Sequence, residues 1–127
     1  MAGRILLVED HPTMREATRM ILDGEGHTVD EAVDGHAALA RLRAARYDLV
    51  LLDLNIPGLS GPDLLTAIRA DPATAGVHVI VVTATGEEGR ASALRLGADG
   101  YFTKPFGPTE LVRRVAMVLE GTDPPAG

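Results

Sequence analysis

Short apolar runs along the chain alternate with stretches in which apolar residues recur every three to four positions. The runs predict strands over Arg4–Val8, Thr28–Ala32, Asp48–Asp53, Val77–Val82 and Gly100–Thr103. The segments DLVLLDL and VHVIVVTAT lack alternation of apolar and polar residues, which is typical of strands covered on both faces in a parallel sheet. The periodic stretches predict helices over Thr13–Asp23, His36–Ala44, Pro62–Ala70, Glu87–Leu96 and Pro108–Glu120.

Strict alternation of strand and helix predicts an α/β fold. Right-handed crossovers favour a doubly wound, flavodoxin-like, five-stranded parallel sheet of order 2-1-3-4-5 with five helices. We expect one domain over residues 1–121, followed by a flexible tail or linker stub over residues 122–127, which are rich in Pro and Gly.

The first helix has two interpretations at its start and a clear apolar face. Thr13 and Glu16 could form a capping box, or Pro12 could be the first helical residue. Its spacing places one apolar stripe against the core, made of Met14, Ala17, Thr18, Ile21 and Leu22.

The composition limits the cellular compartments and the binding partners that are consistent with this chain. The net charge of −6, with basic residues scattered along the 127 positions, argues against direct binding of nucleic acid by this domain. The absence of Cys excludes disulfides and thiolate metal sites. No apolar run reaches membrane-spanning length and no signal peptide is recognisable, so we expect a cytoplasmic protein without membrane contact.

Polar residues terminate four of the predicted strands. Glu9 and Asp10 follow the first, Asp53 closes the third, Thr83 follows the fourth and Lys104 follows the fifth. The carboxyl ends of parallel strands share one edge, and open α/β sheets bind ligands there, where the strand order reverses. We therefore expect these side chains to meet. Asp48, at the start of the same strand as Asp53, should lie roughly 17 Å away at the opposite edge.

The acids at this edge predict a bound cation. Two carboxylates about 5 Å apart repel by roughly 3 kcal/mol at an effective dielectric constant near 20. Lys104 supplies one positive charge against three acids. Oxygen ligands select a hard ion, and few protein ligands favour Mg²⁺ over Ca²⁺.

A metal beside a carboxylate, a lysine and a hydroxyl suits phosphoryl transfer. Asp53 is the best candidate for a nucleophile that forms an aspartyl phosphate, with Lys104 neutralising charge and Thr83 donating a hydrogen bond. Pro57 and Gly58 fit a type II turn that would bring the Asn55 main-chain carbonyl beside the metal. The Lys104–Pro105 bond is a candidate cis peptide, and the sequence leaves its state open.

Four motifs in order, LLVEDHP, DLVLLDLNIPGLSG, VIVVTAT and GADGYFTKPF, resemble the receiver domain of two-component response regulators, with its chemotaxis-protein-like fold. The resemblance implies that a sensor histidine kinase or phosphotransfer protein phosphorylates Asp53. It implies three groups of site residues: Mg²⁺ ligands Glu9, Asp10, Asp53 and the Asn55 carbonyl; phosphoryl contacts Thr83 and Lys104; and a switch formed by Thr83 and the aromatic Tyr101, for which plain packing is the alternative.

The expected function is a phosphorylation-activated signalling switch. It catalyses only its own phosphorylation and autodephosphorylation, and its face of helix four, strand five and helix five regulates an effector protein or a fused output domain. Gly100 stands where the family often has a second acid, which weakens the case for a charge-paired dimer, and a phosphorylation-dependent dimer stays open. The sequence also leaves open whether the chain is a stand-alone receiver, part of a longer regulator or part of a hybrid kinase.

Two rival functions belong to other classes. A phosphate-independent interaction module would not need Asp53, Thr83 and Lys104 together. An aspartyl-phosphate phosphatase needs a general acid two residues after its nucleophile, and Asn55 cannot donate a proton in that way. The histidines show no metal-ligand spacing, and we expect all four at the surface: His11, His27, His36 and His78.

Overall fold

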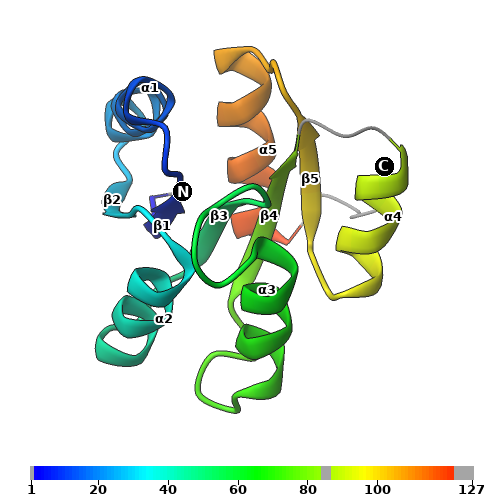
Figure 1. The fold of residues 1–127 in the computed structure, drawn as a ribbon. Coiled ribbons are helices and arrows are strands. Elements are labelled where there is room, and N and C mark those ends of the chain that lie inside the picture. The colour runs from blue at the N-terminus through cyan, green and yellow to red at the C-terminus, as the bar shows by residue number, and fades with distance from the viewer. Residues whose placement is uncertain (1, 84–86, 122–127) are drawn as a thin grey trace.

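Strands and helices alternate along the chain as the apolar pattern predicts (Figure 1). The computed structural model describes residues 2–83 and 87–121, and the side chains of residues 83 and 87–90 lie outside the described part. The strands are β1 (Arg4–Val8), β2 (Thr28–Ala32), β3 (Leu49–Asp53), β4 (His78–Thr83) and β5 (Gly100–Thr103). The helices are α1 (Pro12–Gly24), α2 (Gly35–Ala44), α3 (Gly61–Ala70), α4 (Glu87–Arg95) and α5 (Pro108–Glu120).

The sheet has the predicted topology. Its strand order is β2-β1-β3-β4-β5, and the four neighbouring pairs are all parallel. Because β1 lies between β2 and β3, the sheet grows from β1 to one side with β2 and to the other side with β3, β4 and β5. The strand order therefore reverses at β1. The predicted doubly wound α/β fold is confirmed.

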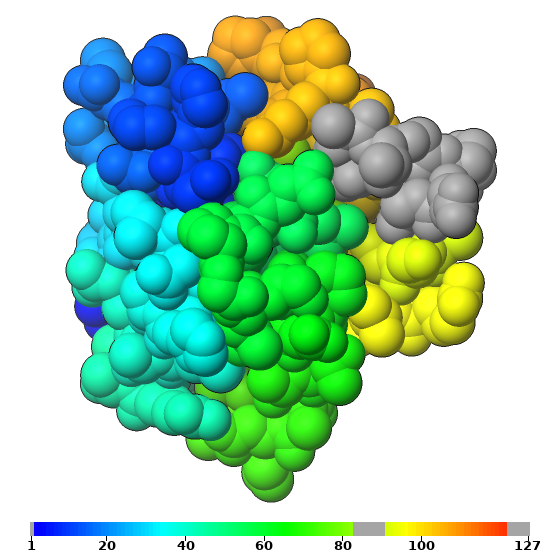
Figure 2. Space-filling view, in the orientation of Figure 1, coloured from blue at the N-terminus to red at the C-terminus, as the bar shows by residue number. Residues whose placement is uncertain are grey.

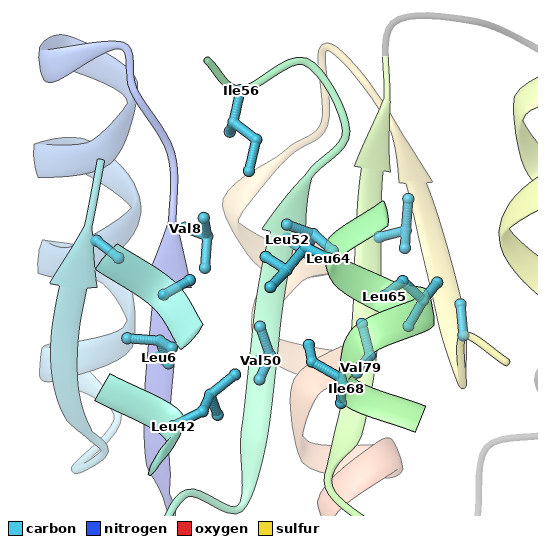
Figure 3. Close-up of a cluster of buried hydrophobic side chains, with 14 of the residues drawn as sticks. Leu6, Val8, Leu42, Val50, Leu52, Ile56, Leu64, Leu65, Ile68 and Val79 are labelled. Carbon is cyan, nitrogen blue, oxygen red and sulfur yellow. The ribbon is translucent and has the colours of Figure 1, made fainter. Parts of the chain in front are cut away.

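Helices cover both faces of the sheet, which explains the unbroken apolar runs. On one face, α2, α3 and α4 pack on a cluster that includes Leu6, Val50 and Val79 (Figure 3). On the other face, α1 and α5 pack on a cluster that includes Leu51 and Ile80. All five residues of β3 are buried, as expected for the central strand.

Differences from the predicted boundaries are small and have local causes. Helix α1 begins at Pro12, with His11 as its N-cap, so the Pro12 alternative is right and the capping box is not formed. Strand β3 begins at Leu49, one residue after the predicted start, and the Asp48 carboxylate accepts a hydrogen bond from the Arg4 N–H at 2.8 Å.

The prediction for His27 is wrong. Its ring is buried, and Nδ1 accepts a hydrogen bond from the Gly3 N–H at 3.0 Å. Burial lowers the pKa of His27, which matches its role as an acceptor. A polar residue between a helix and a strand predicts a loop, but it does not reveal that the N-terminal segment folds over it.

Two further expectations concern the membrane and the tail. Within the described ranges, no helix combines the length and apolar character needed to cross a membrane. The predicted tail or linker stub, residues 122–127, lies outside the described residues, so that boundary stays a prediction.

Candidate functional site

Strand register brings the predicted acids together. Val8 is paired with Leu52, so the next residues along these neighbouring strands, Glu9 and Asp53, follow at the same edge of the sheet. The side chains of Glu9, Asp10 and Asp53 each offer a carboxylate oxygen, and these oxygens lie within 4.8 Å of one another. The predicted convergence is therefore observed for the three acids.

Burial distinguishes these acids. Glu9 and Asp53 are only 4% and 3% exposed, whereas Asp10 is exposed to solvent. Each buried carboxylate accepts a main-chain hydrogen bond, Glu9 from the His11 N–H at 3.2 Å and Asp53 from the Asn55 N–H at 2.9 Å. No hydrogen bond or ion pair to the Asp10 carboxylate occurs among the side chains that the structure describes.

Lys104 reaches the cluster from the far end of the sequence. Its Nζ donates to Asp53 Oδ2 at 2.7 Å and to Glu9 Oε1 at 3.2 Å. The lysine follows β5, and the Lys104–Pro105 peptide bond is cis. A single ammonium therefore bridges the two buried carboxylates.

Burial and neighbouring charges together shift the pKa values of Glu9 and Lys104. Burial, followed by the nearby Asp53, raises the pKa of Glu9 above its ordinary value despite the opposing effects of the His11 N–H and Lys104. Burial of the Lys104 ammonium lowers its pKa, but the hydrogen bonds and charges of Asp53 and Glu9 outweigh this effect and raise the pKa overall. The cluster is thus short of positive charge.

The segment after Asp53 contains a tight turn before α3 begins. Gly58 has a φ of 75°, which suits the second central position of the predicted type II turn. At Gly61, where α3 begins, a Cβ atom would lie 2.5 Å from Leu54 Cα, so only glycine permits this approach. Asn55 is held beside Asp53 by the hydrogen bond from its N–H to Asp53 Oδ1.

A cavity of about 500 Å³ opens over the acids. It is lined by Glu9, Asp10, His11, Thr13, Met14, Ala17, Asp53, Asn55 and Lys104. The apolar part of this wall, Met14 and Ala17, was expected on the buried stripe of the first helix. The stripe extends beyond the core and borders the site, a distinction that helical periodicity cannot make.

In Figure 2 the blue surface of α1 and the orange surface that follows β5 are neighbours, and the green segment after β3 lies below them. Segments from the start, middle and end of the sequence therefore meet at this edge of the molecule. This agrees with the ion pairs of Lys104 with Glu9 and Asp53.

Thr83 and Tyr101 complete the set of predicted residues. Thr83 ends β4 and is paired with Thr103, but its side chain lies outside the described part, so its contact with a phosphoryl group stays a prediction. Tyr101 is half buried on β5 and packs against the core cluster on the face of α2, α3 and α4. Asp48 precedes β3 and lies at the opposite edge from Asp53, as predicted.

Comparison with known proteins identifies this arrangement. The family model described as the response regulator receiver domain matches residues 5–116. The chain belongs to this family. As a receiver domain, it is a signalling module of two-component systems and not a classical enzyme.

Similar proteins agree in sequence and in fold. The chain is 42% identical over 117 residues to the transcriptional regulatory protein ResD of Bacillus subtilis, covering 91% of this chain and 48% of ResD. It is 43% identical over 128 residues to the DNA-binding response regulator MtrA of Mycolicibacterium smegmatis, covering 99% of this chain and 55% of MtrA. The receiver domain therefore spans about half the length of these relatives.

Among solved structures, the chemotaxis response regulator CheY4 of Vibrio cholerae superposes with a TM-score of 0.87 at 28% identity, covering 93% of this chain and 99% of CheY4. A CheY-like receiver domain protein from Methanospirillum hungatei superposes with a TM-score of 0.88 at 29% identity, covering 96% of this chain and 97% of that protein.

Proposed function

We propose that this receiver domain is a signalling switch activated by phosphorylation of Asp53. One observation carries the proposal: three carboxylates lie within 4.8 Å of one another, and Asp53, on the central strand, is ion-paired to Lys104 at 2.7 Å. Structural carboxylates are normally matched by nearby cations, so this excess of negative charge favours a site that receives a cationic ligand.

The donor set fits Mg²⁺. The ligands would be Glu9, Asp10, Asp53 and the Asn55 main-chain carbonyl, and all of them offer oxygen, which a hard cation prefers. When bound, Mg²⁺ supplies positive charge that neutralises the phosphoryl oxygens.

The chemical step is a transfer of a phosphoryl group to a carboxylate. An Asp53 oxygen attacks the phosphorus of a phosphohistidine on a sensor histidine kinase or phosphotransfer protein, and the phosphorus–nitrogen bond breaks. The imidazole nitrogen leaves with the bonding electron pair and takes up a proton. Lys104 would transfer its hydrogen bond from the Asp53 carboxylate to a phosphoryl oxygen, and Thr83 would donate a second one.

The output follows from a shift between two states. Phosphorylation would draw the Thr83 hydroxyl to the phosphoryl group, and Tyr101 would follow, which changes the face formed by α4, β5 and α5. That face would regulate an effector protein or a fused output domain in the cytoplasm. Relatives include a DNA-binding response regulator, which suggests a separate nucleic-acid-binding domain as one such output.

Acetyl phosphate and Mg²⁺, followed by intact mass spectrometry, test the acceptor. We expect one phosphoryl adduct on the wild-type protein and none on the Asp53→Asn variant. Asp48→Asn is the matched control, because Asp48 adjoins the same strand at the opposite edge, and this variant should retain the adduct. An adduct that persists in Asp53→Asn would assign the phosphate elsewhere.

The same assay separates the rival functions. An unmodified mass in the presence of acetyl phosphate and Mg²⁺ would favour a phosphate-independent interaction module. Continuous turnover of added phosphoesters would favour an aspartyl-phosphate phosphatase.

A further inference from the structure

An arginine of α1, Arg15, forms hydrogen bonds with the main chain of Glu9 and Asp10, here called the acidic pair. Arg15 Nη1 donates to the Glu9 carbonyl at 3.2 Å and lies 3.4 Å from the Asp10 carbonyl, with which it also forms a hydrogen bond. Arg15 does not line the cavity; it contacts the residues that do. Its guanidinium therefore contacts the backbone of Glu9 and Asp10 and not the carboxylates of these residues, which line the cavity.

A second contact fixes the guanidinium itself. Arg15 Nε donates to Glu31 Oε1 on β2 at 2.8 Å, and the arginine side chain is 21% exposed. The adjacent residue on β2, Ala32, accepts a hydrogen bond from the Glu9 N–H at 3.1 Å. Main-chain groups of the acidic pair are thus tied to β2 directly and through Arg15.

We propose that Arg15 is a positioning residue for the cation site, which fixes the backbone of Glu9 and Asp10 so that both carboxylates face the cavity. This inference rests on the proposed function, because it concerns the affinity of the site for Mg²⁺. Backbone dihedrals of these two residues determine the directions of their Cβ atoms, and two carbonyl hydrogen bonds restrain those dihedrals in the free protein. Binding then requires less ordering of the ligands.

Electrostatics alone makes the opposite prediction. A guanidinium near the site repels a divalent cation, so its removal would strengthen Mg²⁺ binding if charge were its only contribution. The sign of the change therefore separates positioning from simple charge.

The arginine fork also gives a specific prediction. Arg15 uses Nη1 for the two carbonyls and Nε for Glu31, in a planar group that fixes these donors relative to each other. A lysine keeps the charge but presents one flexible ammonium, which cannot reproduce this geometry.

Isothermal titration calorimetry with MgCl₂ tests the inference on the whole chain. We expect Arg15→Met and Arg15→Lys each to raise the Kd for Mg²⁺ about tenfold, as is typical when a group that orients metal ligands is removed. Arg19→Met is the matched control. Arg19 also pairs with Glu31, at 3.2 Å, but within the described part of the chain it forms no hydrogen bond or ion pair with Glu9 or Asp10, so this variant should bind Mg²⁺ like the wild type.

A fourth variant keeps the test valid if Arg15 variants unfold. Glu31→Gln retains the arginine but weakens its anchor, and we expect a smaller increase in Kd than in Arg15→Met. Urea unfolding of each variant verifies that the titrated protein is folded.

Three outcomes would overturn the inference. Tighter Mg²⁺ binding in Arg15→Met would reduce the role of Arg15 to its charge, and unchanged binding would show that Arg15 does not position the ligands. Equal losses in Arg15→Met and Arg19→Met would assign the effect to the ion pairs of Glu31. If the wild-type protein bound no Mg²⁺, the proposed cation site itself would fail, and that result is distinct from a failure confined to Arg15.

Discussion

Carboxylates lie near both ends of the parallel strands, but their hydrogen-bond and ion-pair partners differ between the amino edge and the carboxyl edge. Toward the amino edge, the carboxylate of Asp30, from the middle of β2, accepts hydrogen bonds from Tyr47 Oη at 2.6 Å and from Arg4 at 3.0 Å. The Arg4 guanidinium also lies 4.8 Å from the centre of the Tyr47 ring. At the carboxyl edge, Glu9, Asp10 and Asp53 converge within 4.8 Å, and Lys104 is the ammonium that bridges two of them.

The pKa values reflect the same contrast. The hydrogen bond from Tyr47, aided by Arg4, lowers the pKa of Asp30, so folding favours its charged form. Burial and the nearby Asp53 raise the pKa of Glu9, so folding disfavours its charged form. At the amino edge, charge stabilises the fold, whereas at the carboxyl edge the buried Glu9 carboxylate costs stability at neutral pH, which the proposed cation would offset.

Removal of the positively charged side chain at each edge, Lys104 or Arg4, should have the largest effect on the free energy of unfolding. Lys104→Met leaves two buried carboxylates without their ammonium, and we expect a loss of about 2 kcal/mol in the free energy of unfolding at pH 7, below the full cost of a buried pair because Lys104 is partly exposed. Arg4→Met should cost less, because Asp30 keeps the Tyr47 hydroxyl. Urea unfolding without divalent cations measures both, and a larger loss in Arg4→Met would contradict the contrast.

The same substitution at the two edges should have opposite signs. Asp10→Asn removes repulsion from an exposed position and should stabilise the metal-free protein by about 1 kcal/mol. Asp30→Asn weakens two hydrogen bonds to a charged acceptor and should destabilise it by about 1 kcal/mol. Addition of Mg²⁺ should stabilise the wild type and Asp30→Asn more than Asp10→Asn. Thermal unfolding with and without Mg²⁺ checks this, and equal signs would refute it.

The pH dependence should give the smallest effect. Because the pKa of Glu9 is raised in the folded protein, the folded state holds this proton more tightly than the unfolded chain, and this group stabilises the fold as the pH falls. We expect the Glu9→Gln variant to have a higher free energy of unfolding than the wild type at neutral pH, both without metal. The difference should disappear as the pH approaches 4.5, the ordinary value for the unfolded chain. Urea midpoints measured across this range test the sign, and a difference that grows on acidification would contradict it.

Much of the fold was predictable because its causes are local. Runs such as Leu49–Leu52 are apolar on both faces, and only a strand covered by helices on both sides buries such a run. Element boundaries shifted by single residues, as at Pro12, which begins α1, and at Asp48, which precedes β3. His27 was misplaced because its burial depends on the N-terminal segment, which its local sequence does not describe.

The candidate site also has features that the sequence predicted and features that it did not. Glu9, Asp53 and Lys104 could be named because each ends or follows a predicted strand, and parallel strands end at a common edge. The side of α1 that borders the cavity and the contact of Arg15 with the acidic pair could not be inferred, because helical periodicity gives a face and not its neighbours.

By itself, the sequence determined the alternation of elements, the burial of the central strand and the residue types at the strand ends, since these depend on patterns within a few residues. Tertiary structure alone decided that Lys104 bridges Glu9 and Asp53 and that Arg15 holds the backbone of the acidic pair. Those contacts join segments brought together by sheet order and helix packing, so their distances depend on the whole fold and not on any local stretch.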